Sequence, residues 1–143
     1  RLRRLDARRA ALQAALDRLG RGAYSAARLC ERLTAGGATR EDAVWAVRAC
    51  IRMGYLREKE QLSDVCRRMY DDGRGPRRIT AKCLCDGYRA ADVEAVLAEA
   101  ERSGQFDFAA RRRELAALWR SRGLTETEIK KKLDAAGFAC EDE

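Results

Sequence analysis

Apolar residues recur along the chain at helical spacing, and one version of the pattern returns every 50 residues. In three places an apolar pair four residues apart is followed, four residues later, by glycine. Such a pair lies on one face of a helix, and glycine can take the left-handed conformation that ends a helix. The sets are Leu29, Leu33 and Gly37; Ile79, Cys83 and Gly87; and Ile129, Leu133 and Gly137. The chain is therefore predicted to contain tandem helical copies of about 50 residues.

The repeat divides the chain into three copies, at 1–56, 57–106 and 107–143. The first two copies are predicted to have three helices each, and the last copy ends after two. The predicted helices are 6–19, 25–36 and 40–53; 58–71, 76–86 and 90–103; and 108–122 and 126–136.

Residues that favour helix starts support these limits. Pro76 suits the first turn of a helix, where its missing N–H costs nothing, and Gly75 before it can take the cap conformation. Side chains that can cap a helix stand at three other starts: Ser25, Thr39 with Asp42, and Thr125 with Glu128.

Composition agrees with an all-α fold. The chain has 26 Ala against 13 Val, Ile and Thr together, and its one proline is Pro76. Units so rich in alanine have thin cores, so neighbouring copies should cover one another's apolar faces. We expect an elongated, curved array whose extended concave surface suits a long partner.

The sequence lacks the features of a metal site and of a membrane span. It has no histidine and no Cys-x-x-Cys pair, so we expect no metal and no cofactor. The six cysteines are expected to be reduced and mostly packed in the interior: Cys30, Cys50, Cys66, Cys83, Cys85 and Cys140. No apolar stretch is long enough to span a bilayer, so we expect a cytoplasmic protein without membrane contact.

An enzyme is not expected. The glycine-rich stretch Gly73-Arg-Gly-Pro76 follows a helix and lacks a Walker lysine, so it is interpreted as a turn between helices. Neighbouring carboxylates such as Asp71 and Asp72 lie beside arginines, where ion pairing or solvation is the expected role.

The formal net charge of +7 is concentrated at the N-terminus. Residues 1–56 hold 12 basic and 5 acidic residues, whereas the other two copies are balanced. Alignment of the copies also collects basic residues into a predicted stripe along the second helix of each copy, with two flanking arginines in the middle copy. The stripe is Arg28, Arg32, Arg78, Lys82 and Lys132, flanked by Arg74 and Arg77.

The stripe has two interpretations. It is a surface for a polyanion or an acidic partner, or a solvated face beside the buried apolar stripe. If it binds a partner, reversing the charges of Arg78 and Lys82 should abolish most binding and leave folding nearly unchanged. If it does not, the N-terminal cluster is the better candidate: Arg1, Arg3, Arg4, Arg8 and Arg9.

Trp45 lies almost opposite the centre of the apolar stripe on its helix. It is expected either to pack between copies or to anchor a partner, because exposed tryptophan is a frequent interface hot spot.

The segments Gly54-Tyr-Leu56 and Gly73-Arg-Gly-Pro-Arg-Arg-Ile79, with Gly87, resemble the RecX regulatory proteins. The resemblance also covers the threefold helical repetition and so spans nearly the whole chain. It implies a protein of DNA repair and the SOS response that binds the RecA recombinase filament along its groove. It further implies inhibition of ATPase and strand-exchange activity, no catalytic residues, and in some members direct binding of single- or double-stranded DNA.

Our leading hypothesis is therefore a monomeric modulator of a RecA-type filament. Two alternatives remain open: a basic helical DNA-binding regulator, and a helical-repeat scaffold that binds proteins. A recognition helix rich in Arg, Asn and Gln would favour the first, and a concave apolar groove would favour the second.

Overall fold

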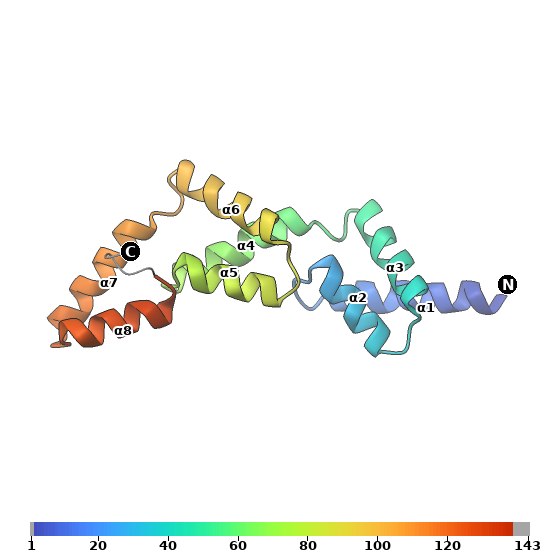
Figure 1. Ribbon diagram of the computed structural model, residues 1–143. Coiled ribbons are helices and arrows are strands. Elements are labelled where there is room, and N and C mark those ends of the chain that lie inside the picture. The colour runs from blue at the N-terminus through green and yellow to red at the C-terminus, as the bar shows by residue number, and fades with distance from the viewer. Residues whose placement is uncertain (1, 139–143) are drawn as a thin grey trace. The chain divides into compact units, whose positions relative to one another are not determined.

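A computed structural model describes residues 2–138 of the chain, and these residues form eight helices and no strand (Figure 1). The all-α prediction is confirmed. All eight predicted helices are present, and the largest difference is that the first begins at Leu2 instead of near residue 6. Their bounds are α1 (Leu2–Leu19), α2 (Ala26–Ala35), α3 (Arg40–Arg52), α4 (Glu58–Asp71), α5 (Pro76–Cys85), α6 (Ala90–Arg102), α7 (Phe108–Ser121) and α8 (Glu126–Ala136).

The predicted helix ends are confirmed by their caps. The side chains of Ser25, Thr39 and Thr125 accept hydrogen bonds from backbone N–H groups at the starts of α2, α3 and α8. The predicted glycines are left-handed, with φ of 109° at Gly37, 92° at Gly87 and 97° at Gly137. These features agree with the repeat, and the stacking of the copies into an elongated array stays a prediction.

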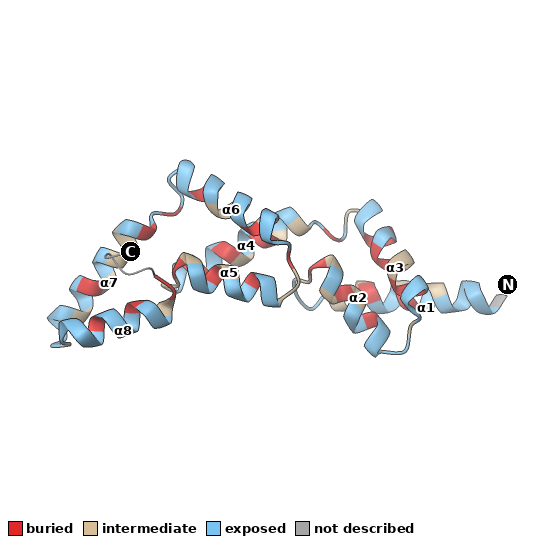
Figure 2. Cartoon of the chain, viewed as in Figure 1, coloured by how far each residue is buried: buried red, intermediate tan, exposed pale blue. Residues whose placement is uncertain are grey.

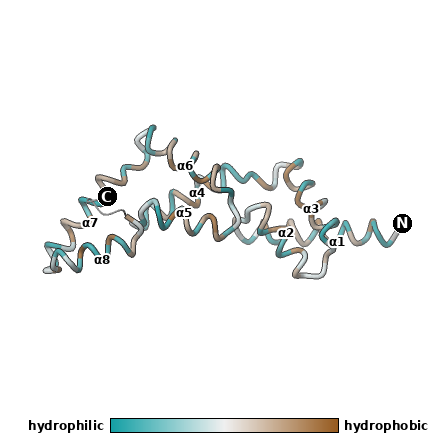
Figure 3. The backbone as a smooth tube through the Cα atoms, viewed as in Figure 1, coloured by the Kyte–Doolittle hydropathy of each residue, from teal (hydrophilic) through white to brown (hydrophobic). Residues whose placement is uncertain are grey.

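The chain divides into two compact units. Unit 1 contains residues up to 61 together with 86–88, and unit 2 contains 62–85 and the residues from 89 onward. In both units, buried residues are interspersed with exposed ones along the helices (Figure 2). The hydropathy of the residues alternates along the helices in the same way (Figure 3).

The core of unit 1 depends on small side chains where α1 packs against α3. Ala11 and Ala15 of α1 and Ala43 and Ala46 of α3 are all buried. Alanine at these positions lets the two helices approach closely. The larger apolar side chains of this core come from α2, α3 and the segment after it: Leu29, Leu33, Val47, Cys50 and Leu56.

Unit 2 has larger side chains in its core. Four aromatic rings form one cluster, in which Tyr70 stacks on Phe106 with centroids 4.4 Å apart and Phe108 meets Tyr70 edge-on at 5.3 Å. Phe138 contacts Phe108 at 6.5 Å and so joins the end of α8 to the start of α7. Each such pair contributes about 0.5–1.5 kcal/mol beyond the area it buries.

In unit 2 the end of α8 lies directly against the start of α5. The backbone N–H of Gly75 donates to the carbonyl of Ala136 at 2.7 Å, and that of Arg77 donates to the carbonyl of Gly137 at 3.1 Å. N–H groups at a helix start and carbonyls at a helix end otherwise lack partners, so each end satisfies the other. A Cβ on Gly75 would lie 2.5 Å from the carbonyl carbon of Gly137, so the contact needs glycine.

In unit 1 the start of α2 is satisfied by side chains. Ser25 donates its hydroxyl to the carbonyl of Asp86 at 2.7 Å. The backbone N–H of Tyr24 donates to the Gln61 side chain at 3.0 Å, and that of Ala26 donates to the Glu58 carboxylate at 2.5 Å. Residue 76, which is equivalent to Ala26, is a proline and has no N–H; residue 108, equivalent to Glu58, is the apolar Phe108. The acceptor Glu58 is therefore present in unit 1, where Ala26 supplies a donor, and its equivalent is apolar in unit 2, where Pro76 supplies none.

The close approach at Gly137 gives a stability prediction with a matched control inside the chain. Gly137→Ala and Gly37→Ala both place alanine in a left-handed conformation, which costs about 1–2 kcal/mol. A Cβ at Gly137 would also lie 2.5 Å from the Cβ of Arg78, whereas a Cβ at Gly37 would meet nothing within 4 Å. We expect Gly137→Ala to cost about 1–3 kcal/mol more than Gly37→Ala in urea unfolding, because its surroundings must move. Equal losses would contradict the close contact.

The pairing of Glu58 with the N–H of Ala26 predicts a non-additive double substitution. Glu58→Ala leaves this partly buried N–H without its acceptor and should cost about 1 kcal/mol. Ala26→Pro removes the N–H, and Ser25 before it already has the extended conformation, with φ −70° and ψ 158°, that a following proline requires. In the Ala26→Pro background, Glu58→Ala should therefore cost almost nothing. The same cost in both backgrounds would show that Glu58 acts in another way.

Candidate partner-binding surface

α5 is the most one-sidedly charged of the helices that carry the predicted stripe. It contains Arg77, Arg78 and Lys82 and no acidic residue. Its apolar side chains Ile79 and Cys83 are buried, and this packing leaves all three basic residues exposed. Arg74, in the turn before α5, is half-buried. The four basic residues predicted for the middle copy are therefore held on one helix and the turn that leads into it.

Arg78 has a structural role that the sequence did not reveal. Its guanidinium donates to the carbonyl of Ala135 at 2.8 Å and so helps to hold the end of α8. The expectation that reversing the charges of Arg78 and Lys82 leaves folding nearly unchanged stays a prediction. This hydrogen bond argues against it, because a carboxylate cannot donate to the Ala135 carbonyl and would repel it. The signal was absent from the sequence because the two residues are 57 positions apart.

Lys132 lies on α8 with its amine over the ring of Trp119, 5.4 Å from the ring centroid. A cation above an indole ring is attracted by the negative face of the ring. The preceding residues Lys130 and Lys131 are also exposed, and together the three lysines make the middle of α8 basic. Alignment of the copies identified only Lys132. The run of three consecutive lysines in the sequence would have identified Lys130 and Lys131 as well.

On α2, the two predicted residues have different surroundings. Arg28 is half-buried and forms an ion pair with Glu31 at 3.5 Å. Arg32 is exposed and lines a cleft of about 340 Å³ between α1 and the turn that joins α2 to α3. Arg18 of α1, which the repeat did not select, lines the same cleft. Unit 1 thus places two guanidinium groups from different helices beside one small cleft.

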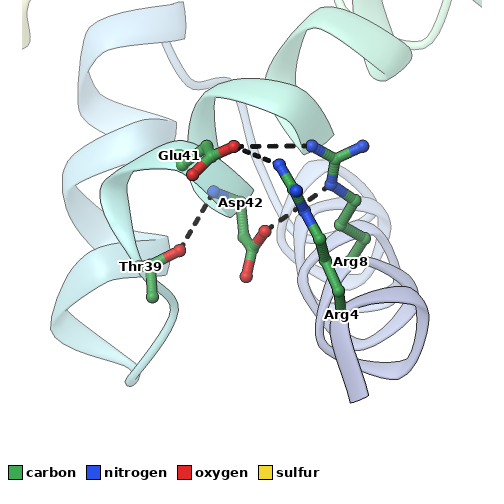
Figure 4. Close-up of polar contacts among 5 residues, drawn as sticks. All are labelled: Arg4, Arg8, Thr39, Glu41 and Asp42. Carbon is green, nitrogen blue, oxygen red and sulfur yellow. Dashed lines mark hydrogen bonds and ion pairs between the residues drawn. The ribbon is translucent and has the colours of Figure 1, made fainter. Parts of the chain in front are cut away.

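The N-terminal arginines do not form a single open cluster. Arg4 and Arg8 of α1 both face the start of α3, where each forms an ion pair with Glu41 (Figure 4). The Nε of Arg8 also lies 3.7 Å from a carboxylate oxygen of Asp42, which is buried. These pairs join α1 to α3, so Arg4 and Arg8 serve the fold. Arg3 and Arg9 are exposed, and Arg1 lies outside the described residues.

Trp45 packs within the first copy. It is half-buried against the core of unit 1, and the guanidinium of Arg8 lies over its ring at 5.3 Å. Neither expectation for this residue, packing between copies or anchoring a partner, accounts for these contacts.

Five cysteines of the described residues lie outside disulfides: Cys30, Cys50, Cys66, Cys83 and Cys85. Cys140 lies outside the described residues. The sulfur atoms of Cys66 and Cys83 are 4.0 Å apart in the core, and this hydrogen bond, with burial, raises the pKa of the Cys66 thiol. Burial also raises the pKa of Cys50. Thiols that stay protonated are poor metal ligands and nucleophiles.

In the part of the chain that the structure describes, no group of three or more His, Cys, Asp or Glu residues could hold a metal ion. In residues 2–138 no helix is both long and apolar enough to cross a membrane. The hydrogen bond from Arg120 lowers the pKa of Glu126. These two exposed side chains link α7 to α8.

Comparison with known proteins gives matches in structure. No family model and no curated protein sequence matches the chain. The crystal structure of RecX from Lactobacillus salivarius matches with a TM-score of 0.63 and 14% sequence identity, covering 92% of this chain and 99% of that one. The crystal structure of a regulatory protein RecX matches with a TM-score of 0.73 and 18% identity, covering 94% of this chain and 68% of that one. The fold that the sequence resemblance implied is thus confirmed: this chain has the fold of the RecX structures.

Proposed function

We propose that this chain is a regulatory protein that binds a RecA-type recombinase filament on DNA and lowers its ATPase and strand-exchange activity. The observation that carries the proposal is the RecX fold, which extends over more than nine tenths of the chain. The glycine-containing segments at 54–56 and 73–79 support it independently, because they resemble RecX in sequence. In this role the chain acts as a monomer in the cytoplasm, modulates DNA repair and the SOS response, and has no catalytic activity of its own.

The distribution of charge supports a partner that is partly nucleic acid. The three basic residues of α5 and the three lysines of α8 are exposed, and the sequence of α5 contains no acidic residue. When this chain is bound to a nucleoprotein filament, its basic side chains would displace counterions from the phosphates of the DNA. They would also pair with acidic side chains of the recombinase. We propose that the copies at 1–56, 57–106 and 107–143 supply successive contacts, with Arg28, Arg32, Arg74, Arg77, Lys82 and Lys132 among them.

The first test is the ATP turnover of the recombinase from the same cell on single-stranded DNA. Adding the chain in several-fold molar excess at low salt should lower the rate of ATP hydrolysis, because a protein lodged on the filament opposes its extension or its turnover. The control omits the recombinase and follows the binding of a labelled oligonucleotide. Unchanged ATP turnover, with tight binding to DNA alone, would replace the proposal with a DNA-binding regulator. Unchanged turnover and no DNA binding would favour a protein-binding scaffold.

A second test concerns the basic surface of α5. Reversing two charges in Arg77→Glu/Lys82→Glu should weaken binding to the recombinase–DNA filament about tenfold and flatten its salt dependence. Arg78 is left unchanged because its guanidinium holds the end of α8. The matched control, Arg67→Glu/Arg68→Glu on α4, changes the net charge equally at exposed residues outside the predicted surface.

Fluorescence anisotropy of labelled filaments at several salt concentrations measures both variants. A similar loss in both would mean that only the net charge of the chain matters. If neither variant loses affinity, α5 is a solvated face and plays no part in binding.

A further inference from the structure

The turn between α3 and α4 exposes three large apolar side chains within five residues. Ile51 is 49% exposed, Met53 49% and Tyr55 62%. In the part of the chain for which burial is described, only three other large apolar side chains are exposed, and those are dispersed over α1, α5 and α7. A concentration of apolar surface on one turn is unfavourable in water unless a partner covers it.

The second copy shows that the fold does not need apolar residues at this turn. The turn between α6 and α7 has the same backbone: φ is 79° at Gly54 and 82° at Gly104. The N–H of Leu56 donates to the carbonyl of Cys50 at 3.2 Å, and the N–H of Phe106 donates to that of Ala100 at 3.0 Å. The residues equivalent to Ile51, Met53 and Tyr55 are the polar Glu101, Ser103 and Gln105.

Charged residues around the two turns differ in the same sense. Arg48, Arg52 and Arg57 accompany the apolar turn, and all three are exposed. Arg57 folds back over the turn, so that a Cβ on Gly54 would lie 3.6 Å from its Nη2 atom. Fifty residues further along the chain, the equivalents of Arg48 and Arg57 are Ala98 and the carboxylate Asp107, whereas Arg52 has a basic equivalent, Arg102. Arg57 also forms an ion pair with Glu60 at 3.5 Å. The first turn is thus apolar and more basic than the second, which is polar and more acidic.

We propose that this turn is a protein-docking surface, distinct from the basic surface of α5, and that its partner is an acidic amphipathic helix. The apolar face of that helix would cover Ile51, Met53 and Tyr55, and its carboxylates would pair with the three surrounding arginines. Nucleic acid is a less suitable partner for this surface. Phosphates make no favourable contact with the aliphatic side chains of Ile51 and Met53, and Tyr55 is the one aromatic ring at this turn on which a base could stack. The inference does not depend on the recombinase being the partner.

The test uses the full chain and a fluorescein-labelled peptide of about 20 residues, with leucine on one helical face and glutamate on the other. A peptide with lysine in place of glutamate and a single-stranded oligonucleotide of thymine are the comparison probes. Anisotropy should show that the chain binds the glutamate peptide and not the lysine peptide. Replacing the turn with its equivalent, Ile51→Glu/Met53→Ser/Tyr55→Gln, should lower affinity for the glutamate peptide at least about tenfold. The fold should be retained, because those residues already occupy the same backbone turn in the second copy.

The matched control is Leu84→Gln/Leu118→Gln, which removes two other apolar side chains, each 43% exposed. It should bind the glutamate peptide as the parent does. Equal losses in the two variants would overturn the proposal by showing nonspecific apolar adhesion. Loss of oligonucleotide binding alone would assign the turn to nucleic acid, and a change confined to the oligomeric state in sedimentation would assign it to a second copy of the chain. Either result would overturn the proposal, as would unchanged peptide affinity in the turn variant.

Discussion

Unit 2 depends on a backbone contact that only glycine allows, between the start of α5 at Gly75 and the end of α8 at Gly137. Hydrogen bonds from the N–H groups of Gly75 and Arg77 satisfy the last carbonyls of α8. The ends of the two helix dipoles that meet there have opposite sign, so the contact is also favourable electrostatically. Neither glycine has room for a Cβ, because an added carbon would lie 2.5 Å from backbone atoms of the other segment. The Arg78 guanidinium adds a hydrogen bond to the carbonyl of Ala135, which is 57 positions away in the sequence.

The same junction in unit 1 uses different chemistry. Ser25 takes the place of Gly75, and its hydroxyl donates to Asp86 where a backbone N–H donates in unit 2. Gly87 takes the place of Gly137, and a Cβ there would lie 2.7 Å from the Ser25 oxygen. In unit 1, Glu58 and Gln61 accept hydrogen bonds from N–H groups at the start of α2, whereas in unit 2 Pro76 lacks the N–H that Ala26 has. The contact thus has the same place in both units, while the hydrogen-bond donors and acceptors that form it differ together.

The arginines divide into those that hold helices together and those that face solvent. Arg4 and Arg8 join α1 to the acidic start of α3, Arg78 holds the end of α8, and Arg111 lies over the ring of Tyr70 at 4.4 Å. Some of the basic residues behind the net charge of +7 thus make contacts within the chain. Exposed basic side chains lie on α5, on α8 and at the turn after α3, as well as on other elements such as α4. The first two suit a polyanionic filament, and the third combines charge with apolar side chains and suits a protein.

The sequence by itself determined the helices, their caps and the conformations of Gly37, Gly87 and Gly137. These depend on groups within four residues of one another, so apolar spacing, a capping side chain and a terminal glycine are enough to predict them. It also determined that the basic residues of α5 are exposed, because Ile79 and Cys83 are apolar and their burial places the basic residues on the face toward solvent. The sequence could not determine that Arg78 serves the fold, that Gly75 needs to be glycine, or that Trp45 lies under Arg8. Those roles belong to contacts between groups 37 to 62 positions apart, and only the packing of the helices brings such groups to hydrogen-bonding or van der Waals distance.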